Sequence, residues 1–320
     1  MRIVVTGAMG HIGSHVVRDL PRRFPGAEIV MIDNLLTQRF PSLFDLPATG
    51  RYRFIEDDVR TADLRPLVRG AQAVVHLAAI TDAAGSFDRA EAVEANNYVG
   101  TLNVATACAD TGTRLIIVSS TSVYGTQSHR VSEDCPLEEL RPQSPYARTK
   151  LREESLTTQM AAERGLRAVV FRFGTVCGVS PGMRFHTAVN KFCWQAVLGQ
   201  PLTVWSTAYD QTRPYLDLCD AAGAIAFAIE RDLFDGRLFN AATDNATVRR
   251  IVDLIREFVP DLAVEFVDSP IMNQLSYDVS CDRLTRLGFA FAGDLRRAVA
   301  DTIGRIGHAN GRRAVAVTLP

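Results

Sequence analysis

A tyrosine and a lysine one helical turn apart are the residues of this chain best suited to chemistry. Tyr146 and Lys150 are four positions apart, so a helix through this segment places both side chains on one face. A neighbouring ammonium favours the phenolate, and a free phenol, with a pKa of about 10, needs that help to accept a proton near neutral pH. The pair could act as a general base. The same spacing also occurs in helices without a catalytic role, so the pair needs partners elsewhere in the chain.

A glycine-rich turn near the start of the chain is the first such partner. Residues 3–5 read as a strand that runs into Gly7, Gly10 and Gly13, and a helical pattern follows over residues 14–20. Glycines placed between a strand and a helix permit a tight turn, let the backbone approach a pyrophosphate, and direct the helix N-terminus at the phosphates. This context predicts a dinucleotide-binding turn. The alternative is a glycine-rich turn without a ligand.

The acid that ends the second strand predicts which dinucleotide binds. Residues 28–32 form an apolar run that ends at Asp33, about 20 residues past the glycines, where a carboxylate can accept hydrogen bonds from an adenosine ribose. That carboxylate repels a 2′-phosphate and no arginine follows it directly, so the sequence favours NAD over NADP. Arg39 is the nearest residue that would favour NADP, because its cation could bind the 2′-phosphate.

Two further strands deliver small and hydroxylated residues to the same region. Residues 73–77 read as a buried strand that leads to Ala78 and Ala79, and residues 115–118 as another that leads to the run 119–122. Ligands of open α/β sheets bind at the carboxyl ends of the strands. Hydroxyls placed there can contact a ligand, although Ser and Thr are also common in ordinary turns. The alternation of strands and helices predicts an α/β protein with a doubly wound parallel sheet of the Rossmann type and a smaller C-terminal α/β lobe.

Composition excludes several classes of protein. The chain has 320 residues and a net charge of −1, so nothing attracts it as a whole to nucleic acid or to an anionic membrane. No apolar run approaches the ~20 residues of a membrane span, and the start of the chain lacks the pattern of a signal peptide. We therefore expect a cytoplasmic protein. The six cysteines and six histidines are scattered without metal-ligand spacing, which predicts reduced thiols and no metal.

In their order and spacing, these motifs resemble those of the extended short-chain dehydrogenase/reductases, the nucleotide-sugar epimerase/dehydratase group. The similarity extends over about half of the chain. It is carried by the glycine turn, Asp33, Asp57-Asp58-Val59, His76-Leu77-Ala78-Ala79, Asn97-x-x-Gly100-Thr101-x-Asn103, Ser119-Ser120-Thr121-Ser122-Val123-Tyr124-Gly125 and Ser144-Pro145-Tyr146-x-x-x-Lys150. The chain differs from the usual pattern at His11, where an apolar residue is commoner, and at Thr149, where serine is typical.

The resemblance implies roles for individual residues. Ser120 would bond the reacting sugar hydroxyl, Tyr146 would be the base, and Lys150 would favour the phenolate and hold the nicotinamide ribose. NAD would be bound by Gly7, Gly10, His11, Ile12, Gly13, Asp33, Asn34, Asp58, Val59, Leu77, Ala78, Ala79, Asn97, Ser119, Tyr146 and Lys150. The sugar nucleotide would contact Thr81, Ser120, Thr121, Ser122, Thr175, Asn190 and Arg213. Arg213 would clamp the diphosphate, with a surface ion pair as its alternative role.

The resemblance also implies the organisation of the chain. Residues 1–175 would form an NAD-binding domain with the Tyr/Lys pair, and residues 176–310 a nucleotide-sugar-binding lobe that exchanges segments with it. Residues 311–320 would be a tail. A homodimer would form through the helices that contain Asn97 and Tyr146.

Thr121 and Ser122 favour one reaction among those of the family. The 4,6-dehydratases carry an Asp-Glu pair at these positions, and the decarboxylases that make UDP-xylose carry a glutamate at the second. The 3,5-epimerase/reductase branch has a cysteine near here, whereas this chain has none between Cys108 and Cys135. We therefore predict NAD-dependent epimerisation at C4 through a transient 4-keto sugar. A dehydratase, decarboxylase or keto-sugar reductase on the same scaffold, or a non-catalytic dinucleotide-binding regulator, remains open.

Overall fold

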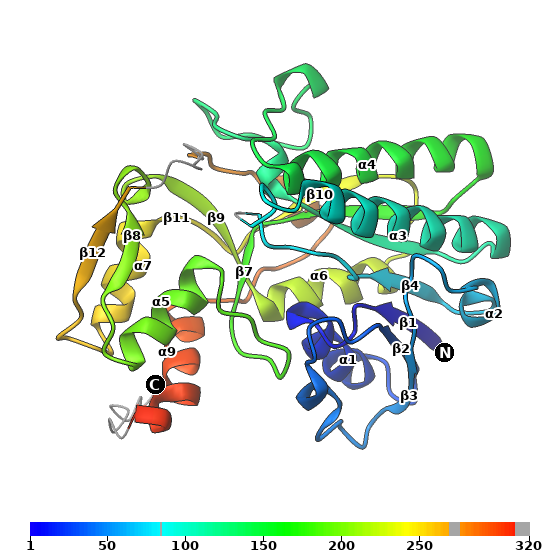
Figure 1. Ribbon diagram of the computed structural model, residues 1–320. Coiled ribbons are helices and arrows are strands. Elements are labelled where there is room, and N and C mark those ends of the chain that lie inside the picture. Colours follow the sequence, from blue (N-terminus) through cyan, green and yellow to red (C-terminus); the bar gives the residue numbers. More distant parts are fainter. Residues whose placement is uncertain (84, 269–275, 311–320) are drawn as a thin grey trace.

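A seven-stranded sheet organises the larger of two lobes (Figure 1). The computed structural model describes residues 1–83, 85–268 and 276–310, so the predicted tail lies outside the described residues. The strand order is β10-β6-β5-β4-β1-β2-β3 and every pairing is parallel, which confirms the doubly wound parallel sheet. Its strands are β1 (Arg2–Thr6), β2 (Glu28–Asp33), β3 (Arg51–Glu56), β4 (Ala73–His76), β5 (Leu115–Ser120), β6 (Ala168–Phe173) and β10 (Leu238–Ala241).

Helices cover both faces of this sheet because its strands are apolar on both sides. Successive residues of β1 point to opposite faces: Ile3 and Val5 pack in one buried cluster and Val4 in another. The first cluster includes residues of α1 (His11–Arg23) and α6 (Leu218–Glu230), and the second includes residues of α3 (Ala90–Thr111) and α4 (Pro145–Arg164). Figure 1 shows these two helix pairs on opposite sides of the sheet. The short helix α2 is Arg65–Val68.

The smaller lobe has its own sheets and its own core. A three-stranded sheet has the order β11-β9-β7 and a two-stranded one pairs β12 with β8. Its elements are β7 (Thr175–Cys177), α5 (Ala188–Val197), β8 (Leu202–Trp205), β9 (Thr212–Asp217), β11 (Asp244–Thr247), α7 (Val248–Arg256), β12 (Val264–Val267) and α9 (Leu295–Ile306). The chain crosses between the lobes repeatedly, because α6 and β10 lie in the larger lobe although they follow β9.

Short elements complete the connections between these strands and helices. They are η1 (Phe40–Leu43), η2 (Thr121–Val123), η3 (Leu137–Glu139), η4 (Ser206–Ala208), α8 (Asp282–Thr285) and η5 (Gly307–Asn310). Among the described residues, no helix is long and apolar enough to cross a bilayer.

The residues at the two ends of helix α4 determine where the helix begins and ends. The Ser144 Oγ accepts a hydrogen bond from the Ala147 N–H at 3.1 Å, and Pro145 occupies the first turn, where a missing N–H is harmless. Gly165 ends the helix with φ 65°, a left-handed conformation that glycine adopts without strain. The cap therefore fixes Tyr146 in the first turn of α4 and Lys150 one turn further along.

Candidate active site

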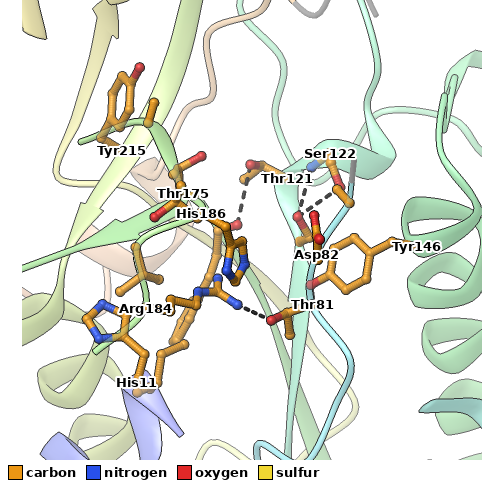
Figure 2. A pocket seen from close by; sticks show the side chains of 18 of the residues that line it. His11, Thr81, Asp82, Thr121, Ser122, Tyr146, Thr175, Arg184, His186 and Tyr215 are labelled. Atoms are coloured by element: carbon orange, nitrogen blue, oxygen red, sulfur yellow. Dashed lines mark hydrogen bonds between the residues drawn. The ribbon is translucent and has the colours of Figure 1, made fainter. Parts of the chain in front are cut away.

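A cavity of about 340 Å³ brings together most of the residues that the sequence singled out (Figure 2). It lies where the carboxyl ends of β1, β4 and β5 face the smaller lobe. The predicted site residues that line it are Gly7, Gly10, His11, Ile12, Gly13, Leu77, Ala79, Thr81, Ser119, Ser120, Thr121, Ser122, Tyr146, Lys150, Thr175 and Arg213. Those that do not line it are Asp33, Asn34, Asp58, Val59, Ala78, Asn97 and Asn190.

Tyr146 and Lys150 occupy one wall of the cavity. The Lys150 Nζ lies 5.9 Å from the centroid of the Tyr146 ring and 2.8 Å from the Glu153 Oε2. Lys150 is only 4% exposed. Burial lowers the pKa of Lys150, but Glu153 and Tyr146 outweigh burial and raise this pKa above its ordinary value. The lysine therefore presents an ammonium beside the phenol.

The hydroxyl groups at the end of β5 and in η2 lie next to this pair. The Ser120 Oγ accepts hydrogen bonds from the Ser122 N–H at 3.2 Å and from the Ser122 Oγ at 2.9 Å. The Thr121 Oγ1 is 3.2 Å from the Tyr277 hydroxyl of a distant segment. Figure 2 shows Ser122 on the Tyr146 side of the cavity. These contacts fix the three hydroxyls at the sheet edge where a ligand can reach them.

The glycine turn has the shape that a pyrophosphate requires. A Cβ on Gly13 would lie 2.2 Å from the Gly7 carbonyl oxygen, and one on Gly7, which has φ +65°, would lie 2.5 Å from the Ala78 nitrogen. Helix α1 starts at His11, within this turn, and its N-terminus has neither a side-chain cap nor an acidic residue in the first turn. Its free N–H groups and positive end can thus bind phosphate oxygens.

Asp33 supports the turn although it does not line the cavity. Its Oδ2 accepts a hydrogen bond from the Met9 N–H at 2.9 Å, and its Oδ1 accepts one from the Leu35 N–H at 2.9 Å. The carboxylate is fixed at the end of β2 beside the glycines. A carboxylate oxygen can accept more than one hydrogen bond, so Asp33 retains acceptor capacity for a ribose. The turn and this acid together fit a bound NAD.

Three of the other predicted ligand residues brace loops. The Asn97 side chain accepts from the Ile80 N–H at 2.7 Å and donates to the Ile80 carbonyl at 2.9 Å. Asn190 is fully buried, and its Nδ2 donates to the Arg184 carbonyl oxygen at 3.0 Å. Asp58 forms an ion pair with Arg60 at 2.7 Å. Asn97 and Asn190 therefore shape the cavity from behind its lining, because their amides are already used within the protein.

Arg184, Asp82 and Tyr277 also line the cavity, although no motif of the sequence points to them. The Arg184 Nη1 donates to the Thr81 Oγ1, and no carboxylate of the described residues forms an ion pair with Arg184. Its Nε has no hydrogen-bond partner in the described part of the chain. Burial lowers the pKa of Arg184, an effect that Tyr146 opposes. Arg184 is thus a cation that faces the cavity, and among the described residues Asp82 acts on it without forming an ion pair.

The segment that carries Arg184 is attached to the glycine turn. The Ser180 Oγ lies 2.8 Å from the His11 Nδ1, and the Gly182 N–H donates to the Ser14 Oγ at 2.9 Å. A Cβ on Gly182 would lie 2.2 Å from the Met9 carbonyl oxygen. Burial lowers the pKa of His11 well below its ordinary value, so the imidazole is neutral. The unusual residue at position 11 therefore joins the two lobes.

Comparison with known proteins places the chain in a family. Residues 3–242 match the NAD dependent epimerase/dehydratase family. The chain is 30% identical over 267 residues to an uncharacterised UDP-glucose epimerase, YtcB, of Bacillus subtilis, which covers 80% of this chain and 82% of that protein. It is 29% identical over 304 residues to a trifunctional UDP-glucose 4,6-dehydratase, 3,5-epimerase and reductase of Arabidopsis thaliana, covering 90% of this chain but only 44% of that protein.

A solved structure agrees with this placement. The UDP-glucuronic acid 4-epimerase from Bacillus cereus, in complex with UDP-glucuronic acid and NAD, superposes with a TM-score of 0.85 at 27% identity. The match covers 97% of this chain and all of that one. The glycine turn, the parallel sheet and the family match together identify the chain as a member of the NAD-dependent epimerase/dehydratase family, with NAD as its cofactor.

Proposed function

We propose that the protein epimerises a nucleotide-diphosphate sugar at C4. The observation that carries this proposal is the placement of Tyr146, Lys150 and Ser120 in one cavity with the glycine turn. NAD held at the glycine turn would supply the acceptor and donor of a hydride for the reacting sugar carbon. Tyr146 removes the proton of the hydroxyl on that carbon, because Lys150 stabilises its phenolate. Ser120 orients the same hydroxyl by a hydrogen bond, and Tyr146 later returns the proton to the keto oxygen.

Elimination of water is disfavoured because the cavity offers few acids. Asp82 is the sole carboxylic acid among the described residues that line it. The Asp82 Oδ1 accepts a hydrogen bond from the Gly85 N–H at 3.0 Å, and the Oδ2 lies 3.7 Å from the Arg89 guanidinium. Both contacts hold this carboxylate against its own loop. A dehydratase or decarboxylase on this scaffold is the alternative that a product analysis would reveal.

We assign the substrate to the smaller lobe. In this proposal residues 1–175 bind NAD and residues 176–310 bind the nucleotide, with Arg213 at the diphosphate. Arg213 lines the cavity, and its Nε has no hydrogen-bond partner among the described residues. A forked cation with free donors suits a diphosphate. Because the Bacillus cereus neighbour holds a UDP sugar, we propose that the nucleotide here is also UDP.

The sugar that best fits the cavity carries a carboxylate. Arg184 supplies an unpaired cation, and the hydroxyls of Thr121 and Thr175 line the same space. A uronic acid would provide the directly paired carboxylate that Arg184 does not find among the described residues. The Bacillus cereus neighbour is named for UDP-glucuronic acid, which agrees with this choice. We therefore propose a UDP-uronic acid as the substrate, with a neutral UDP-hexose as the alternative.

The homodimer and the cytoplasmic location both remain proposals. Val99 and Leu102 of α3 are 42% and 39% exposed, which suits the proposed homodimer through α3 and α4. Light scattering of the purified protein tests the dimer. A cytoplasmic location remains a prediction from the sequence.

The proposed reaction is tested by incubating the purified protein with UDP-glucuronic acid and with UDP-glucose. Epimerisation leaves the mass of the sugar nucleotide unchanged and inverts C4 in the NMR spectrum, whereas dehydration or decarboxylation lowers the mass. Tyr146→Phe should lower kcat by roughly 10²- to 10⁴-fold, the range of a general base, while NAD stays bound. Tyr209→Phe, a tyrosine outside the cavity lining, is the control. Near wild-type turnover in Tyr146→Phe, or only mass-changing products, would overturn the proposal.

A further inference from the structure

A buried carboxylate beneath Lys150 has no role in the cycle proposed above. Glu153 is 0% exposed, and its Oε2 lies 2.8 Å from the Lys150 Nζ. The two residues are three positions apart on α4, so one helix turn holds them together. A carboxylate placed that deep is retained only with a charge partner or hydrogen bonds, because burial of a lone charge is very unfavourable.

A chain of buried polar groups that starts in the sheet reaches α3 near Glu153. The Thr6 Oγ1 lies 2.7 Å from the His76 Nδ1, and the His76 Nε2 lies 3.1 Å from the Thr101 Oγ1. Burial raises the pKa of Glu153 above its ordinary value, and Lys150, with a smaller contribution from the Thr101 hydroxyl on α3, opposes that rise. Polar groups of β1, β4 and α3 thus extend to Thr101, in the neighbourhood of this carboxylate.

The neighbouring charged groups leave Glu153 as the principal counter-ion of Lys150. Glu154 follows it on α4, but its carboxylate is held by Arg172 of β6 at 2.7 Å. His76 of β4 is neutral, because burial, with a smaller contribution from Lys150, lowers its pKa to about 3. Tyr146 is the remaining titratable group of α4 beside Lys150, and Arg184 faces the phenol from the other lobe.

We propose that Glu153 is a positioning residue of the base: it holds the Lys150 ammonium in place and offsets part of its charge, and so sets the pH at which Tyr146 and Lys150 release a proton. The inference rests on the proposed function, in which Tyr146 is the base. An anion beside an ammonium weakens the positive potential at the nearby phenol. Removing that anion strengthens the potential and makes proton release easier, whichever of the two coupled groups loses the proton.

The alternative is that Glu153 serves the stability of the fold alone. Loss of one partner of a buried ion pair is destabilising in either case, so stability cannot separate the two roles. The position of the pH profile of kcat/KM separates these two roles. Only a residue whose charge acts on Tyr146 or Lys150 moves the pH at which their proton is released.

The test compares Glu153→Gln and Glu153→Asp with the wild-type holoenzyme. The control is Glu163→Gln, the same change at an exposed position of α4. We expect the low-pH limb of kcat/KM in Glu153→Gln to move toward lower pH by about one unit, as a charge at this separation implies. Glu153→Asp keeps the charge and should stay within about 0.3 units of wild type, as should Glu163→Gln.

A second readout does not depend on turnover. The ultraviolet absorbance of tyrosinate is titrated in each protein, and the signal of Tyr146 is the difference from the matching Tyr146→Phe protein. An unchanged midpoint, or a shift to higher pH, in Glu153→Gln overturns the inference. Absence of product from the wild-type enzyme with either sugar nucleotide overturns the proposed function instead. If Glu153→Gln does not fold, Glu153→Met removes the same charge and should show the same shift; failure of both to fold assigns Glu153 to stability and overturns the inference.

Discussion

Arg172 on β6 binds Glu154 on α4 through two hydrogen bonds, from Nη2 to Oε2 at 2.7 Å and from Nε to Oε1 at 3.0 Å. Both side chains are buried, at 3% and 6% exposure. The guanidinium also lies over the Tyr124 ring, 4.7 Å from its centroid. This ion pair joins the helix that carries Tyr146 and Lys150 to the central sheet.

Glu154→Gln should therefore lower the free energy of unfolding by about 3 kcal/mol or more, because it leaves the Arg172 charge buried without a partner. Urea unfolding measures this free energy, provided that the slope with denaturant stays constant. Asp210→Asn removes one partner of the exposed Arg249–Asp210 pair and should change the same quantity by less than about 1 kcal/mol. Equal losses in the two variants would show that the buried pair does not anchor α4.

Gly13→Ala should prevent normal NAD binding. The added Cβ would lie 2.2 Å from the Gly7 carbonyl oxygen, which is backbone and cannot move without opening the turn. We expect NAD affinity to fall by about tenfold or more, equivalent to ~1.4 kcal/mol, as measured by calorimetry. Gly304→Ala on α9, where a Cβ meets nothing within 4 Å, should keep wild-type affinity. Undiminished NAD binding in Gly13→Ala would refute the assignment of the turn.

The buried His76 should make the free energy of unfolding depend on pH. Burial is the main cause that lowers its pKa from 6.5 to about 3, so the folded protein keeps this imidazole neutral where the unfolded chain protonates it. The contribution is fully present above pH 6.5 and is lost as the pH falls toward 3. Near pH 5 we expect a loss of about 2 kcal/mol of unfolding free energy relative to pH 7.5.

The variant His76→Asn isolates that contribution, because it removes the group and leaves the carboxylates unchanged. Its stability difference from wild type should shrink by the same ~2 kcal/mol between pH 7.5 and pH 5. The exposed His129 gives the control: His129→Asn should keep the wild-type pH dependence. A pH-independent difference for His76→Asn would mean that the histidine is not held neutral.

Arg184→Gln should change the preference between two substrates that differ in one group. If the guanidinium binds a uronate carboxylate, the ratio of kcat/KM for UDP-glucuronic acid to that for UDP-glucose should fall by about tenfold or more, as expected for hydrogen bonds to a charged group. Arg89→Gln, outside the cavity lining, should leave the ratio unchanged. A uniform loss on both substrates would instead place Arg184 at the phosphates or in the fold.

The sequence was sufficient to predict the features of the fold and site that depend on a few neighbouring residues. Apolar runs of strand length, the glycine turn and the spacing of Tyr146 and Lys150 each follow from a few adjacent residues, and the structure contains the parallel sheet that they imply. Arg184 could not be found in this way, because its position depends on the contacts of Ser180 and Gly182 with the glycine turn. Motif spacing likewise did not reveal that the Asn190 amide is used inside the protein.

The contact between His11 and Ser180 has a kinetic implication. A segment of the smaller lobe is hydrogen-bonded to the turn that would hold the pyrophosphate, and we expect those hydrogen bonds to slow the release of the dinucleotide. A catalyst that regenerates its oxidant within each cycle does not need to exchange it. Slow escape of the dinucleotide is therefore compatible with fast turnover, and the protein should retain its cofactor through purification.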